Sequence, residues 1–182
     1  TNTGALRLTV SRTGTFTGSL RFDSDTLLLT GAFDTGGLAR FGPTRAAGAV
    51  LARSNKPALT LAMQLNLSPE GPHEVYGTIG QTVGREVTER SIFTAARDFY
   101  DGRDRLLPAA YLVHDGRYTI RMANAGDSGG LVRLSPGGSA TLAIKLSDGT
   151  SVLASAPLSE SNRAAFFWPL YTSRTGRFGG TI

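Results

Sequence analysis

Apolar and polar residues alternate along most of the chain, so that every second residue tends to be apolar. Leu6, Leu8 and Val10, for example, are separated by polar residues. In a β-strand this spacing places apolar side chains on one face and polar side chains on the other. The same pattern, or a short apolar run, recurs at 16–22, 26–30, 38–41, 58–67, 75–79, 118–122, 131–134, 140–146, 151–156, 164–171 and 178–182. It predicts an all-β protein with about ten to twelve short strands.

Clusters of Gly, Pro, Asp and Ser separate these apolar segments. Residues 23–25, 34–37 and 68–72 are rich in such turn formers, each of which favours a chain reversal. Asp148 and Gly149 stand between two alternating segments. This pair predicts a two-residue hairpin turn in which Gly149 has a positive φ.

Residues 85–100 fit neither the strand period nor the helix period well. Val87, Ile92 and Phe99 lie loosely on one face of a helix, whereas alternation over the same stretch is poor. We predict a strand to about Phe93, followed by a helical turn or loop to Pro108.

The order of elements repeats between the two halves of the chain. Residues 14–22 align with residues 138–146 at an offset of 124 residues. Further along, residues 58–65 resemble residues 164–171. Weak identity in a consistent order indicates a duplicated half of roughly five or six strands.

We therefore predict a single β domain over residues 1–182. It would consist of a first half at about 4–84, a connector at about 85–115 and a second half at about 116–182. Two related halves of this size can form a closed or nearly closed antiparallel barrel or sandwich, which removes most free strand edges.

Composition narrows the chemistry. The 182 residues contain no Cys, which excludes disulfides, thiolate metal sites and cysteine nucleophiles. The formal net charge is +5, but the cations stand singly within apolar alternation, as expected of solvated strand faces. We predict no nucleic-acid partner, no cofactor and, since no apolar run approaches the length of a spanning helix, no membrane span.

Several segments together resemble a known kind of module. They are the runs at 14–20, 29–34, 57–67, 76–79, 116–120, 146–150, 157–159, 168–171 and 176–180. In combination they resemble a β-rich repeat module of large secreted or surface proteins of environmental bacteria. The resemblance implies a non-enzymatic structural or interaction module, extracellular or at the cell surface, without catalytic residues to transfer.

The segment Gly126-Asp127-Ser128-Gly129-Gly130 resembles the nucleophile loop of chymotrypsin-like serine proteases. That mechanism needs an imidazole to take the serine proton. The only histidines are His73 and His114, and their spacing from Ser128 does not fit a two-barrel protease. A serine hydrolase is therefore disfavoured. We expect a loop serine away from the core, whose replacement by Ala changes stability by no more than about 0.5 kcal/mol.

Asp98, Asp101 and Asp104 form the densest group of carboxylates. Their spacing is not that of a known calcium loop, and neighbouring arginines would oppose a cation. Two separated histidines without a third ligand make a poor zinc site. We expect a solvated loop and no metal site.

The remaining candidates for ligand or partner contacts are aromatic residues. Alternation assigns Phe166 and Trp168 to one strand face, and Phe167 and Tyr171 to the other. A solvated face rarely carries an aromatic pair. We therefore propose Phe167 and Tyr171, together with Tyr76, as ligand or partner contacts, and a carbohydrate-binding module as the alternative function.

The terminal segments suggest a mode of association. The strands expected at 6–10 and 178–182 stand close to the two ends of the sequence. We expect them to pair with another copy or an adjoining domain, because strand addition at an open edge supplies backbone hydrogen bonds without a specific pocket.

Overall fold

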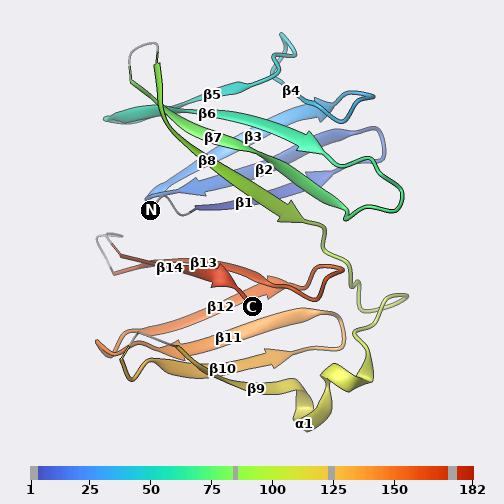
Figure 1. The fold of residues 1–182 in the computed structure, drawn as a ribbon, viewed down its shortest axis with the longest axis vertical. Coiled ribbons are helices and arrows are strands. Elements are labelled where there is room, and N and C mark those ends of the chain that lie inside the picture. Colours follow the sequence, from blue (N-terminus) through green and yellow to red (C-terminus); the bar gives the residue numbers. More distant parts are fainter. Residues whose placement is uncertain (1–3, 84–85, 123–125, 172–175) are drawn as a thin grey trace. The chain divides into compact units, whose positions relative to one another are not determined.

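The computed structural model describes residues 4–83, 86–122, 126–171 and 176–182, and over these residues the protein is all-β (Figure 1). This confirms the fold class expected from the alternation. The strands are β1 (Gly4–Val10), β2 (Thr15–Phe22), β3 (Asp25–Phe33), β4 (Ala39–Phe41), β5 (Ala49–Arg53), β6 (Lys56–Leu65), β7 (Glu74–Val83), β8 (Glu86–Ala96), β9 (Arg117–Arg121), β10 (Gly129–Leu134), β11 (Ser139–Lys145), β12 (Ser151–Pro157), β13 (Ala165–Leu170) and β14 (Gly176–Thr181).

Helical structure in these residues is confined to the 3-10 helix η1 (Ala109–Tyr111) and the short helix α1 (Val113–Gly116). No helix in the described residues has the length and apolar character needed to cross a membrane.

The strands form four antiparallel sheets, in the orders β1-β2-β3-β4, β5-β6-β7-β8, β12-β11-β10-β9 and β13-β14. No closed barrel is present in the described residues, so the barrel expected from the sequence is not found. The described part of the chain contains fourteen strands, more than the ten to twelve expected. β5 was missed because Ala49–Arg53 carries apolar residues at consecutive positions and lacks the alternation that marks a half-buried strand.

The chain divides into two compact units, Thr1–Arg97 and Asp98–Ile182. The predicted connector at 85–115 therefore needs correction at its start. Glu86–Ala96 is β8 and pairs with β7 along its whole length, with one register shift. The strand expected to end near Phe93 runs three residues further. The single domain over 1–182 stays a prediction.

In the first unit, two four-stranded sheets enclose one core. Phe16 and Leu29 come from the sheet β1-β2-β3-β4, and Leu59, Leu61 and Met63 come from the sheet β5-β6-β7-β8. All five side chains are almost completely buried within a single apolar cluster. Alternation along each strand thus directs one face of each sheet into a shared interior.

Arg53, at the end of β5, connects these two sheets through an ion pair with Asp23. Its side chain is almost fully buried. Nη1 donates a hydrogen bond to Oδ2 of Asp23, in the β2–β3 turn, at 3.0 Å. Nε donates to the carbonyl of Pro57 at 2.8 Å, and the guanidinium lies 5.5 Å from the centroid of the Phe22 ring.

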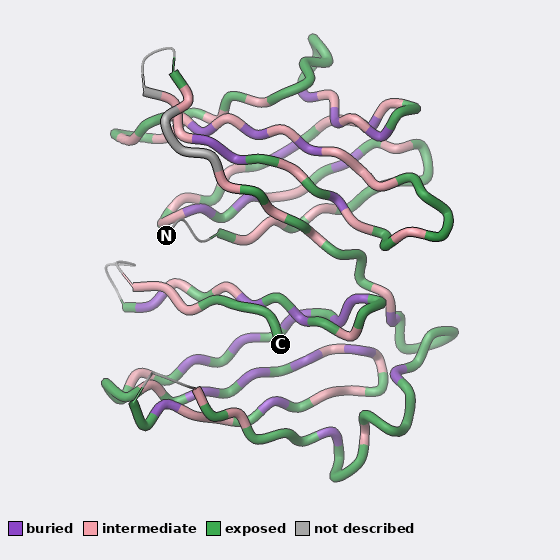
Figure 2. The backbone as a smooth tube through the Cα atoms, in the orientation of Figure 1, coloured by how far each residue is buried: buried purple, intermediate pink, exposed green. Residues whose placement is uncertain are grey.

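In the second unit, the sheet β12-β11-β10-β9 and the hairpin β13-β14 contribute to one core. Leu142 and Val152 come from the larger sheet, and Phe166 and Leu170 come from the hairpin. Buried positions alternate with exposed ones along β11 and β12 (Figure 2). The outer face of the larger sheet is therefore open to solvent.

One turn geometry joins strands at five places. In each, the N–H of the first residue donates to the carbonyl of the fifth, and the N–H of the fourth donates to the carbonyl of the first. The fourth residue has a positive φ in every case. The turns span 11–15, 34–38, 135–139, 146–150 and 159–163.

This geometry corrects the turn at Asp148-Gly149. Gly149 has the expected positive φ, at 84°. The hydrogen bonds from Leu146 to Thr150 and from Gly149 to Leu146, however, close a three-residue loop and not a two-residue one. Gly14 and Gly138, which the sequence alignment matches, hold the same turn position. The internal duplication itself stays a prediction.

Candidate functional site

Tyr171 follows directly after β13 and joins the two sheets of the second unit. Its φ is 63°, and its side chain is 52% exposed. The hydroxyl donates a hydrogen bond to Oδ2 of Asp148, in the β11–β12 turn. The ring lies against Gly176 so closely that a Cβ there would collide with it. Both the ring and the hydroxyl of Tyr171 therefore make contacts within the second unit.

The contact between Tyr171 and Asp148 shifts the pKa of each group. The hydrogen bond from Tyr171, supported by the N–H of Thr150, lowers the pKa of Asp148 from its ordinary value. The same hydrogen bond and the negative charge of Asp148 raise the pKa of Tyr171. The pair is most favourable with a neutral phenol and an ionised carboxylate.

Phe167 lies in the middle of β13 and is half-buried. Its ring is 3.7 Å from the position that a Cβ on Gly179 would occupy. Trp168, assigned by alternation to the same face as the buried Phe166, is exposed. A hairpin of two strands offers no third strand to cover an indole ring.

Tyr76 lies in β7, in the first unit, and is 49% exposed. It stands opposite Gln64 of β6 and Thr94 of β8. Phe167 and Tyr171 thus share one hairpin region, whereas Tyr76 belongs to the other unit. The three residues proposed from the sequence do not form one constellation within either unit.

Ser128 has a structural contact that the sequence did not reveal. The residue is only 3% exposed, and its Oγ accepts a hydrogen bond from the N–H of Ser147 at 2.9 Å. It therefore holds the start of the β11–β12 turn. The expectation of a serine away from the core is wrong, because the loop folds back against that turn.

Of the three carboxylates at 98, 101 and 104, that of Asp101 holds a loop together through backbone hydrogen bonds. One carboxylate oxygen of Asp101 accepts hydrogen bonds from the N–H groups of Arg103, Asp104 and Arg105, at 2.8 to 3.0 Å. The backbone hydrogen bond from Arg105, followed by that from Arg103, lowers the pKa of Asp101. Among the described residues, no group of three or more His, Asp or Glu side chains could hold a metal ion.

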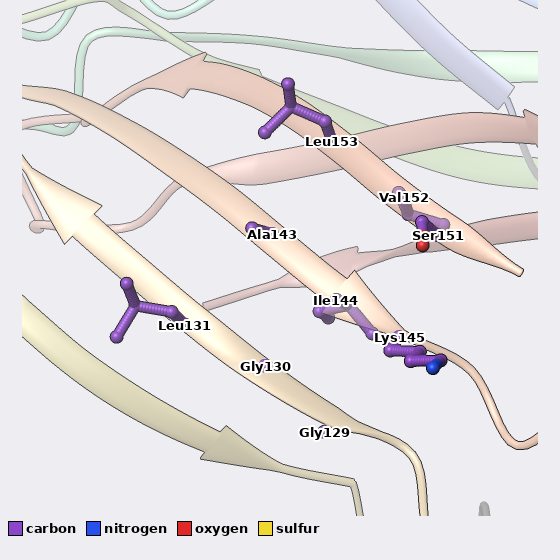
Figure 3. Close-up of a pocket in the computed structure, with 9 residues that line it drawn as sticks. All are labelled: Gly129, Gly130, Leu131, Ala143, Ile144, Lys145, Ser151, Val152 and Leu153. Carbon is purple, nitrogen blue, oxygen red and sulfur yellow. The ribbon is translucent and has the colours of Figure 1, made fainter. Parts of the chain in front are cut away.

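A shallow hollow of about 440 Å³ lies on the sheet β12-β11-β10-β9. Figure 3 shows Leu131 and Leu153 on either side of Ala143, with Gly129 further along β10. The polar positions of these strands indicated a solvated face, and the hollow was not predicted from the sequence. Its signal is the repetition of small or apolar residues at outward positions, which becomes visible only once the strand register is known.

Comparisons of the chain with protein-family models, with curated proteins and with solved structures gave no match. The resemblance to bacterial surface modules therefore stays a prediction from the sequence motifs.

Proposed function

We propose that this chain is a non-enzymatic structural and interaction module of an exported bacterial surface protein or extracellular assembly, and that it associates by strand addition at β14. The observation that carries the proposal is the free edge of the hairpin β13-β14. Within the described residues, β14 pairs only with β13. Unpaired backbone groups along an edge are a template for another strand.

The register identifies which groups of β14 face this edge. Ala164 and Ile182 exchange both backbone hydrogen bonds, and pairing alternates along an antiparallel ladder. Gly179 and Thr181, at the intervening positions, therefore direct their N–H and C=O groups outward. Both are exposed, and neither carries a charge that would repel an incoming strand.

The opposite edge of the hairpin is protected. Pro169 of β13 stands opposite Arg177, at a position where the backbone faces away from β14. Proline has no N–H to donate, and prolines on edges discourage pairing. One edge of the hairpin is thus blocked and the other is open, which favours a directed contact over general aggregation.

The alternative of a carbohydrate-binding module has less support. A sugar platform needs ring faces that are free to stack. The Tyr171 ring packs on Gly176 and its hydroxyl is bonded to Asp148. Its exposed surface is therefore committed in part to these contacts, and Tyr76, which is 49% exposed, is the remaining exposed ring. A single exposed tyrosine on β7 supports sugar binding less strongly than the open edge of β14, beside the proline-blocked edge of β13, supports strand addition.

Replacement of Thr181 tests edge pairing. Thr181→Pro removes an outward N–H and leaves the hydrogen bonds between β13 and β14 in place, whereas Thr181→Val keeps the N–H and serves as the control. We expect sedimentation velocity to show concentration-dependent association that Thr181→Pro abolishes and Thr181→Val retains. Hydrogen exchange at 178–182 should be as slow as at 140–146 in the associated form. A monomer at all concentrations, with fast exchange at 178–182, would refute the proposal.

A further inference from the structure

The outer face of the sheet β12-β11-β10-β9 is organised as a grid. Strand register aligns outward residues into three rows that cross the four strands from β9 to β12. The central row is Thr119–Leu131–Ala143–Leu153, and the flanking rows are Arg117–Arg133–Thr141–Ser155 and Arg121–Gly129–Lys145–Ser151. We call this set of twelve residues the outer grid.

Three of the four residues in the central row, Leu131, Ala143 and Leu153, are apolar, and all four are exposed. Leu131 is 40% exposed and Leu153 is 65% exposed. Ala143 lies between them and is too small to fill the space that they border (Figure 3). The resulting hollow extends over Gly129, which has no side chain to occupy it. Both leucines keep a large part of their apolar surface in water, where a partner can cover it.

The flanking rows are cationic. Arg117 stands directly opposite Arg133, although like charges in register destabilise a strand pair. Arg121 and Lys145 stand on either side of Gly129. The grid contains no carboxylate, and no ion pair involving these four cations occurs among the described residues. A stable unit does not need this arrangement, which points to an external anion.

We propose that the outer grid binds an acidic protein segment in which apolar side chains are flanked on both sides by carboxylates. The apolar side chains would enter the hollow between Leu131 and Leu153, and the carboxylates would meet the cations. Neighbouring rows are two residues apart along each strand, or about 7 Å. This distance equals the spacing of alternate side chains in an extended partner strand, so its carboxylates and apolar groups can meet their rows together.

Both features of the grid are needed to select this partner. A polyanion without apolar side chains, such as an acidic polysaccharide, would engage the cations and leave the two leucines exposed to water. A purely apolar partner would leave the four cations without counter-charges. Charge complementarity gives specificity and fast encounter, and apolar burial supplies affinity. The inference goes beyond the proposed edge pairing and stands without it, because it uses a sheet face and not the β14 edge.

Binding of defined probes to the full chain tests the proposal. The first probe is a fluorescent peptide, kept short enough to stay monomeric, in which Glu, Leu and Glu stand at alternate positions with Ser between them. In an extended strand these three side chains lie on one face. The second is the same peptide with Ser in place of Leu, and the third is polyguluronate. The variants are Arg117→Gln/Arg133→Gln and Leu131→Ser/Leu153→Ser. Matched controls in the first unit are Arg7→Gln/Arg21→Gln and Leu28→Ser, since these side chains are also exposed on strands.

We expect the Glu–Leu peptide to bind most tightly of the three probes and to weaken as salt is raised, because the ionic contacts are exposed. Each double variant of the grid should reduce its affinity roughly tenfold, and the controls should have no effect. Absence of binding, equal binding of all probes with no effect of Leu131→Ser/Leu153→Ser, or equal losses in the controls would overturn the proposal. The second of these outcomes would assign the grid to polyanions.

Discussion

The hydroxyl of Tyr171 donates a hydrogen bond to the carboxylate of Asp148, and this contact ties the end of β13 to the turn between β11 and β12. The two residues are 23 positions apart in the chain and adjoin strands of different sheets of the second unit. The two sheets of the second unit share a core, and this hydrogen bond adds a polar contact between them at its edge.

The pH dependence of stability should reveal this contact. A lowered pKa of Asp148 stabilises the fold above the unfolded value of about 4, and that stability is lost as the pH falls through the folded pKa. A raised pKa of Tyr171 stabilises the fold below about 10 and is lost as the pH rises through the folded pKa. The wild type should therefore exceed Tyr171→Phe in stability most clearly between these limits.

Urea denaturation of wild type and Tyr171→Phe at pH 3, 7 and 11 would measure the difference. We expect it to be largest at pH 7 and to shrink at both extremes. Asp148→Asn should reduce the low-pH change in the same way. A difference close to zero at all three pH values would mean that Tyr171 acts only through its ring packing on Gly176, which Phe retains.

Ser128→Ala should destabilise the second unit by about 1 kcal/mol, because it removes the acceptor for the Ser147 N–H. Ser151→Ala, at an exposed position of the neighbouring strand β12, should cost less than about 0.5 kcal/mol. Chemical denaturation of both variants would check this. Equal stability of the two variants would mean that the hydrogen bond between Ser128 and Ser147 does not contribute to stability.

Gly149→Val should destabilise by roughly 1–3 kcal/mol, because a β-branched residue is strained at positive φ. No atom lies within 4 Å of the position that a Cβ would take, so crowding does not contribute. Gly149→Asn is the control and should be milder. Asn162 already occupies the equivalent place in the turn at 159–163, with φ of 57°. Similar melting of the Val variant and the wild type would exclude the turn geometry.

Arg53→Ala should destabilise the first unit by about 3 kcal/mol, since it removes a buried cation that serves Asp23, the Pro57 carbonyl and the Phe22 ring together. Arg40, which pairs with Asp34 at 2.9 Å near the surface, provides the contrast. Arg40→Ala should cost less than about 1 kcal/mol. Chemical denaturation of both variants at the same salt concentration would measure the two losses of stability. It tests whether the buried ion pair contributes more than the surface pair.

Alternation along the chain was sufficient to predict the all-β class, and the Asp148-Gly149 pair was sufficient to predict the positive φ of Gly149. A period of two assigns each side chain to a face but does not name the strand that covers that face. The grouping of Phe16 and Leu61 into one core therefore could not be predicted, nor could the division of the chain near Arg97. The start of β8 was ambiguous because apolar residues fit a helix and a strand equally poorly.

The candidate surfaces were predictable to a smaller extent. Tyr171 was chosen as an exposed aromatic residue, and it is exposed, but its contact with Asp148 depends on the packing of two sheets. The outer grid is visible in the sequence only as separate residues, such as Arg117 and Leu131. Their alignment follows from strand register, which the turns determine and local pattern does not.

The order of strands in the sheets has a consequence for folding. In the four sheets that the described residues form, each strand pairs only with strands adjacent to it in the chain. No sheet therefore requires closure of a long loop before its first hydrogen bonds form. Hairpins of this kind form in about 1–10 μs, and short sequence separations favour rapid folding. We expect each sheet to assemble turn by turn, so that the mutual docking of two finished sheets over their core limits the rate in each unit.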